Sequence, residues 1–240
     1  MEYLAIGPAS MGLFTFLGRL KRFETELKNI KEISGASAGA LLGTFLALEI
    51  PLDDAFDKLM MIDIEGLSKY KLRSFLKNFG FIDCENVRDA LIDMYDCNPT
   101  FSELKKKLYI AAYNLNRGKT EYFSVDTHPH MHVVDAICMS ISIYIDGGTK
   151  EITPLEPFIG KPAHKVVSFT LRNEEKYIEK INSLFEYVST FLNRILDFRI
   201  DPYAHMKIKH IPVTTGDFNI FKFNMSHDDK LRMYLHGFNQ

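Results

Sequence analysis

A serine flanked by glycines constrains this chain more than any other feature of its sequence. Gly35-Ala36-Ser37-Ala38-Gly39 is a G-x-S-x-G pentapeptide, with an apolar strand pattern before it and the small, apolar segment 38–48 after it. In this motif the serine lies on a sharp strand-to-helix turn, where the neighbouring backbones come so close that side chains two residues to either side must be absent. The sequence therefore predicts Ser37 at such a turn, with Gly35 and Gly39 providing the space.

Strand and helix patterns alternate along the rest of the 240 residues. The apolar run 3–6 predicts a first strand, and a helical repeat follows over 10–27. Further strands are expected at 108–113, 120–125, 143–148 and 166–171, and helical segments at 51–95, 131–140, 174–196 and, after an irregular tail, from residue 228. This alternation predicts a three-layer α/β/α fold with a central, mainly parallel sheet, formed by a single domain over residues 1–240. Ligands of such folds bind at the carboxyl ends of the strands.

Composition and charge exclude several classes of protein. The net charge of −2 and the pI near 6.5 provide no broad basic field, so nucleic acid is not an expected partner. Three cysteines without CxxC spacing, Cys84, Cys97 and Cys138, favour a reducing compartment over a disulfide framework. The first residues resemble no secretory signal, and the longest apolar stretches are shorter than the ~18 residues that span a bilayer. We expect a cytoplasmic protein that contacts membranes at most peripherally.

A serine hydroxyl is a poor nucleophile until a base accepts its proton, and the usual base is a histidine oriented by a carboxylate. In α/β hydrolases the catalytic residues follow in the chain order Ser, acid, His. Four histidines come late enough in this chain to fit that order: His164, His205, His210 and His236. However, the elbow of that class normally follows several strands, whereas only one predicted strand precedes the Ser37 turn. The topology therefore disagrees with an α/β hydrolase.

Three motifs, in this order, resemble those of the patatin-like phospholipase family. They are the glycine loop after the first strand, the pentapeptide around Ser37, and Asp146-Gly147-Gly148. The segments between them also resemble the family's middle region: 100–104, the polar turn through Gly118, 122–124, 135–137 and Ser140. The resemblance covers about residues 3–160 and implies a catalytic dyad of Ser37 and Asp146. In such a dyad the carboxylate itself accepts the serine proton and returns it to the leaving alcohol.

The glycines of the third motif have two interpretations. Gly147 and Gly148 would let the backbone turn sharply, so that the carboxylate of Asp146 faces Ser37. Taken by itself, the tripeptide is also a plain turn signal. The order of the three motifs favours the dyad.

The first glycine loop departs from the family's pattern. The family's oxyanion loop is usually glycine-rich, with a basic residue before the last glycine, whereas this chain has Gly7-Pro8-Ala9-Ser10-Met11-Gly12. Pro8 has no N–H group and Met11 carries no charge, so the expected oxyanion-hole residues are Ala9, Ser10 and Gly12. This variant loop is similar to that of family members from large DNA viruses. Dinucleotide binding is a weaker alternative, because the Rossmann glycine spacing is absent.

The resemblance implies a lipid acyl hydrolase of the phospholipase or lysophospholipase kind that works through an acyl-serine intermediate. It implies a lipid substrate and no metal or other cofactor. Residues 142–144 run straight into the third motif, where the family usually has a loop with proline and aromatic residues, so part of the pocket wall is missing. Two alternatives stay open: an acyltransferase with the same dyad, and an inactive lipid-binding or scaffold protein.

Two further patterns have competing interpretations. His128, His130 and His132 alternate and could bind zinc on a strand, but Pro129 between them favours an exposed loop. The apolar stripe of the predicted helix 174–196 could lie on a lipid surface, although its mixed polar face favours packing in the core or against a second copy. The oligomeric state is left open.

Overall fold

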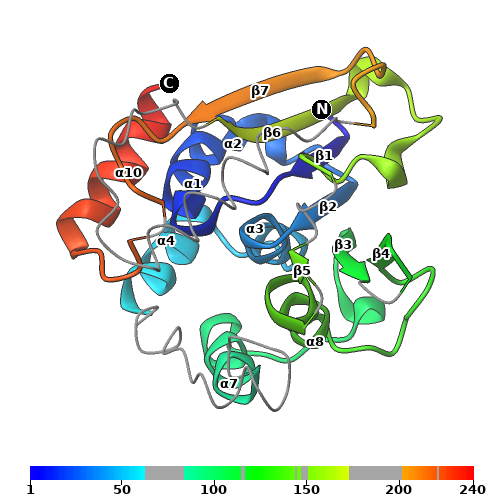
Figure 1. Cartoon of the computed structure of the whole chain (residues 1–240), viewed down its shortest axis with the longest axis horizontal. Coiled ribbons are helices and arrows are strands. Elements are labelled where there is room, and N and C mark those ends of the chain that lie inside the picture. The colour runs from blue at the N-terminus through cyan, green and yellow to red at the C-terminus, as the bar shows by residue number, and fades with distance from the viewer. Residues whose placement is uncertain (63–83, 115–116, 144, 147–150, 173–201, 221) are drawn as a thin grey trace.

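The computed structural model describes residues 1–62, 84–114, 117–143, 145–146, 151–172, 202–220 and 222–240 (Figure 1). The first third contains β1 (Tyr3–Ile6), the 3₁₀-helix η1 (Ser10–Gly12), α1 (Leu13–Arg22), α2 (Glu24–Leu27), β2 (Glu32–Ala36), α3 (Ala38–Ala47) and α4 (Leu52–Met61). The middle contains α7 (Cys84–Tyr95), η2 (Phe101–Glu103), β3 (Lys107–Asn114), β4 (Lys119–Phe123), α8 (Val133–Cys138), the π-helix η3 (Met139–Ile143) and β5 (Ile145–Asp146). The last third contains η5 (Glu156–Phe158), η6 (Ala163–Lys165), β6 (Val166–Arg172), β7 (Lys209–Thr214) and α10 (His227–Asn239). None of these described helices is long and apolar enough to span a bilayer.

The described strands form one seven-stranded sheet in the order β4-β3-β2-β1-β6-β7, with β5 paired to β3 off this path. Successive neighbours from β3 to β7 are parallel, whereas β4 and β5 are antiparallel to β3. The predicted α/β class with a central, mainly parallel sheet is therefore confirmed. Because the five parallel strands share one direction, the loops after β1, β2, β6 and β7 all lie at the same edge of the sheet.

Each strand divides its side chains between the two faces of the sheet. In β1, Leu4 and Ile6 belong to the larger core, whereas Ala5 between them belongs to a smaller core on the opposite face. The larger core collects buried side chains from α1, α3, α4, α7, α8 and α10. The smaller core contains Leu155 and Phe158, so the segment 151–165 covers part of the second face. The predicted helix 174–196 lies outside the described residues.

Two sequence-based expectations need correction. The region after residue 201 was expected to be irregular up to the closing helix, but it contains β7, which pairs in parallel with β6. This strand alternates buried Ile211 and Val213 with exposed residues and includes Pro212, which an edge strand tolerates because one side of its backbone needs no partner. The helix expected over 10–27 begins as η1 and breaks at Phe23 between α1 and α2.

Helices α1 and α10 touch through their backbones at two glycines. A Cβ atom at Gly18 of α1 would lie 1.9 Å from the carbonyl oxygen of Tyr234, and one at Gly237 of α10 would lie 2.0 Å from that of Thr15. Carbon and oxygen atoms normally stay more than 3 Å apart, so no side chain fits at either position. The closing helix therefore packs on α1 by backbone contact (Figure 1).

An ion-pair cluster at the N-terminus predicts acid sensitivity. Hydrogen bonds from Lys165 and Lys31 lower the pKa of Glu2 from 4.5 to about 2. Since the folded state has the lower pKa, the stabilisation is complete above pH 4.5 and is lost as the pH falls to about 2. We expect Glu2→Gln to lower the thermal unfolding midpoint at neutral pH by a few degrees, and the difference from wild type to vanish near pH 2. A difference that persists unchanged in acid would contradict this assignment.

Candidate active site

The structure places Ser37 at the turn between β2 and α3. Its backbone angles are φ 53° and ψ −122°, a conformation that residues with a side chain rarely adopt and that costs about 1–3 kcal/mol. The residue is 8% exposed. Helix α3 begins at the next residue, so the partial positive charge of a helix N-terminus lies beside Ser37.

The glycines on either side of Ser37 allow backbone segments to approach closely. A Cβ atom at Gly35 would lie 2.5 Å from the carbonyl oxygen of Gly39. A Cβ atom at Gly39 would lie 2.2 Å from the carbonyl oxygen of Ile6. The start of α3 therefore packs directly against the end of β1, which brings the loop after β1 next to the turn at Ser37.

That loop presents two amides that have no acceptor among the described residues. The N–H of Gly12 donates to the carbonyl of Ala9 at 2.8 Å, whereas the N–H groups of Ala9 and Ser10 make no hydrogen bond within the described segments. Ser10 has a φ of 48°, so this loop contains a second left-handed serine. Of the three predicted oxyanion-hole residues, Ala9 and Ser10 therefore have amides without an acceptor in the described part of the chain, whereas the Gly12 amide is bonded.

The backbone of Asp146 lies along the same edge of β3 as β2, just beyond the point where β2 ends before Ser37. Ala112 of β3 pairs with Glu121 of β4 on one edge of the strand. It also pairs with Asp146 of β5, so β5 lies on the opposite edge. Strand β2 occupies that same edge as far as Ala111. Figure 1 shows β5 beside β2 and α3. Because β5 is antiparallel to β3, it runs towards the end of β2, and Asp146 is its residue nearest the turn. Its side chain, and the predicted turn residues Gly147 and Gly148, lie outside the described part of the structure.

A second serine, Ser140, is hydrogen-bonded to the backbone of the turn at Ser37. The N–H of Ser37 donates to Oγ of Ser140 at 2.8 Å, and the Ser140 hydroxyl donates to the carbonyl of Ala111 at 2.7 Å. Ser140 is fully buried and belongs to the π-helix η3 that leads into β5. In the sequence, Ser140 entered only through the family resemblance, because nothing local indicates a partner 103 residues away.

All eight histidines lie in described segments, and none of them hydrogen-bonds to Ser37 there. Of the four candidates from chain order, His210 bonds through Nδ1 to Ser168 on the neighbouring strand at 2.8 Å. His236 lies 3.5 Å from the hydroxyl of Thr214. His164 is in η6, before β6 begins, and His205 lies in a turn before β7. The geometry thus provides no histidine base for Ser37 among these residues.

The segment after the third motif is anchored beside the same sheet edge. A Cβ atom at Gly7 would lie 2.7 Å from the carbonyl oxygen of Ile152, so this segment packs against the loop after β1. The phenol of Tyr122 on β4 donates to the buried carboxylate of Glu151. Burial raises the pKa of the Tyr122 phenol, and the nearby Glu151 raises it further, so the phenol stays protonated as the donor.

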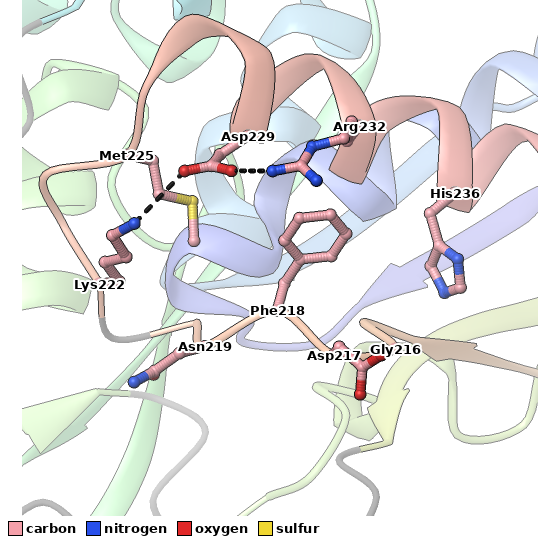
Figure 2. A pocket seen from close by; sticks show the side chains of 9 residues that line it. All are labelled: Gly216, Asp217, Phe218, Asn219, Lys222, Met225, Asp229, Arg232 and His236. Carbon is pink, nitrogen blue, oxygen red and sulfur yellow. Dashed lines mark hydrogen bonds and ion pairs between the residues drawn. The ribbon is translucent and has the colours of Figure 1, made fainter.

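A pocket of about 560 Å³ lies at the carboxyl end of β7 (Figure 2). Its lining comes from residues 216–219, 222 and 225, which follow β7, and from α10, and Asp229 forms ion pairs there with both Lys222 and Arg232. None of the predicted site residues lines it. The pocket is connected to the site indirectly, because Ile220 of this loop accepts a hydrogen bond from the N–H of Met11 at 3.1 Å.

The described segments contain no group of three or more histidine, cysteine or acidic side chains that could hold a metal ion. His128 and His130 are exposed in the loop before α8. His132 is half-buried, forms an isolated β-bridge with Thr100, and its Nδ1 is hydrogen-bonded to the carbonyl of Asn98 at 2.9 Å. The loop interpretation of this pattern is therefore the one that fits the structure.

A serine on a strained strand-to-helix turn of an α/β sheet defines the class of serine-elbow α/β proteins. The chain belongs to the patatin-like phospholipase family, which it matches over residues 9–159. It is also 26% identical over 275 residues to the uncharacterized protein R571 of Acanthamoeba polyphaga mimivirus, an alignment that covers 98% of this chain and 90% of R571. The predicted resemblance to the family and to members from large DNA viruses is thereby confirmed.

Solved structures agree with the fold. VipD from Legionella pneumophila superposes with a TM-score of 0.58 at 13% identity, covering 100% of this chain and 65% of VipD. The type III effector ExoU of Pseudomonas aeruginosa superposes with a TM-score of 0.56 at 12% identity, covering 99% of this chain and 51% of ExoU. The chain therefore spans about half to two thirds of the length of these proteins, and at such identities the likeness establishes the fold alone.

Proposed function

We propose that this protein is a lipid acyl hydrolase that uses Ser37 as nucleophile and Asp146 as its only catalytic partner. The observation that carries the proposal is the register of β5, which brings the backbone of Asp146 to the edge of β3 that β2 leaves at Ser37. Membership of the patatin-like phospholipase family supports an ester of a lipid, in particular a phospholipid or lysophospholipid, as substrate. The lack of a histidine bonded to Ser37 in the described segments supports a dyad over a triad.

The proposed reaction has two halves. Asp146 accepts the proton of Ser37 while Oγ attacks the ester carbonyl carbon, and the N–H groups of Ala9 and Ser10 bind the oxygen that becomes negative. The intermediate then collapses, Asp146 returns the proton to the leaving alcohol, and an acyl-serine remains. In the second half, water attacks the acyl carbon and gives a proton to Asp146, which passes it to Ser37 as the fatty acid leaves. Gly12, whose amide is bonded to Ala9, contributes small size rather than a hydrogen bond.

A fluorophosphonate probe tests the nucleophile directly. The probe phosphonylates an activated serine, and we expect stoichiometric labelling of the folded protein at Ser37, located by mass spectrometry, with no labelling of Ser37→Ala. Labelling should be unaffected by a chelator, because the proposed chemistry uses no metal. A well-folded wild-type protein that resists the probe would instead support the inactive lipid-binding or scaffold alternative.

Product analysis separates hydrolysis from acyl transfer. With a phospholipid or lysophospholipid as the acyl donor, a hydrolase releases free fatty acid whether or not an acceptor alcohol is present. An acyltransferase with the same dyad would instead form a new ester in proportion to the acceptor. We expect free fatty acid to be the main product in both conditions.

A further inference from the structure

We infer that Ser140 is a positioning residue that fixes the catalytic geometry of Ser37. The inference rests on the proposed function, in which Ser37 is the nucleophile. It starts from two hydrogen bonds that meet at a single buried oxygen: Ser140 Oγ accepts the N–H of Ser37 at 2.8 Å and donates its own proton to the carbonyl of Ala111 at 2.7 Å.

The bridge lies where the parallel ladder between β2 and β3 ends. Residues Glu32 to Ala36 pair in register with Lys107 to Ala111, and the chain then turns away at Ser37. In parallel strands, the N–H groups of one strand bond to carbonyls of its neighbour. At the end of β2, the hydroxyl of Ser140 bridges the N–H of Ser37 and the carbonyl of Ala111. It thereby links the departing backbone to the sheet.

The strain at Ser37 explains why the link is needed. A residue with a φ of 53° persists only where its surroundings determine its conformation. The carbonyl of Ser37 accepts bonds from Ala40 and Leu41 inside α3, which hold the helical side of the turn. Its N–H is bonded only to Ser140 within the described residues, so this bond holds the strand side.

The same short segment also leads to the acid. Ser140 is in η3, and β5 follows with Asp146 opposite Ala112, one residue beyond the carbonyl that Ser140 bonds. A π-helix is rare and often occurs at functional sites, where the extra residue per turn redirects side chains. Here it brings a hydroxyl back towards β3 just before the strand that contains the acid. The Ser140 bridge therefore fixes two things relative to Ala111 and Ala112 of β3: the turn at Ser37 and the approach of β5.

The test is Ser140→Ala, with Ser168→Ala as matched control. Ser168 is also fully buried and also hydrogen-bonded, to His210, but it lies on β6 away from the turn. We expect Ser140→Ala to lower kcat for ester hydrolysis and the rate of fluorophosphonate labelling by at least about 10-fold, because misplaced reacting groups cost rate even when binding persists. KM should stay close to wild type. Ser140→Thr, which keeps the hydroxyl, should restore most of kcat, and Ser168→Ala should leave it unchanged.

A readout without catalysis distinguishes this inference from the proposed function. In Ser140→Ala the Ser37 amide loses its acceptor, so its hydrogen exchange should become at least about 10-fold faster than in Ser168→Ala. If wild type is active but kcat and labelling in Ser140→Ala match the Ser168→Ala control, the positioning role is overturned while the hydrolase proposal stands. If wild type is neither active nor labelled, the hydrolase proposal fails, and unchanged exchange at Ser37 would overturn the bridge as well. If Ser140→Ala does not fold, a Ser140→Thr variant with normal fold and low kcat would overturn the inference.

Discussion

Ser37→Ala and Asp146→Asn should each reduce ester hydrolysis by at least about 10³-fold while leaving the fold intact. Alanine removes the attacking oxygen, and asparagine keeps the shape of the acid but cannot accept the proton of Ser37. Because the two residues act in one step, the double variant should be little worse than either single variant. The measurement is kcat/KM with a chromogenic acyl ester, with circular dichroism and thermal unfolding to show that the fold is retained.

Two matched substitutions control this experiment. Asp228→Asn changes an exposed acid in the first turn of α10, and Ser168→Ala removes a buried hydroxyl from β6. Both should hydrolyse the ester at the wild-type rate. Full activity in Ser37→Ala or in Asp146→Asn would end the dyad proposal. Loss of activity on replacement of His210 or His236, with Asp146→Asn still active, would favour a histidine base.

The second large effect concerns stability. We expect Gly18→Ala to lower the free energy of unfolding by about 3 kcal/mol, because its Cβ atom would be forced into the carbonyl of Tyr234 and the two helices would have to separate. Gly237→Ala should cost a similar amount, since the added atom would meet the carbonyl of Thr15. The two losses should be less than additive, because either substitution alone separates α1 from α10. Denaturant unfolding measures both.

Gly43→Ala in α3 is the control for helix propensity. Its Cβ atom would meet only methyl groups of Ile33 and Leu108, each at 3.1 Å, and these side chains can shift. Alanine is also favoured over glycine in a helix by up to ~1 kcal/mol, so we expect this variant to stay within about 1 kcal/mol of wild type. A Gly18→Ala protein as stable as the Gly43→Ala protein would show that α1 and α10 do not touch in this way.

The sequence predicted the parts of the fold that follow from local pattern. Strands β1 and β6 and the start of α3 lie where the apolar runs and the glycines of the sequence predicted them. Such apolar runs fit strands that are buried on both faces of a layered sheet. Strand β7 was missed because Pro212 and exposed Lys209 and His210 hide the alternation of its two buried residues, a composition that only an edge position permits.

The candidate site was predictable to a different extent. The motifs around Ser37 and Asp146 could be found in the sequence, because positions where backbones approach closely require glycine. The bonded state of the Gly12 amide and the hydroxyl bridge of Ser140 were not visible, because both depend on where distant backbone atoms come to lie. Sequence patterns report local conformation and burial, whereas hydrogen-bond partners across 103 residues are set by the assembled sheet.

The pairing of β5 with β3 has a consequence for how activity arises during folding. Ser37 lies early in the chain, whereas Ser140, which accepts its N–H, and the strand containing Asp146 both come more than a hundred residues later. A nascent or refolding chain that has formed only its first strands and helices thus contains Ser37 without Asp146, its proposed catalytic partner, and without the Ser140 bond. Recovery of enzymatic turnover should therefore lag behind recovery of helical signal, which makes catalysis a late indicator of complete folding.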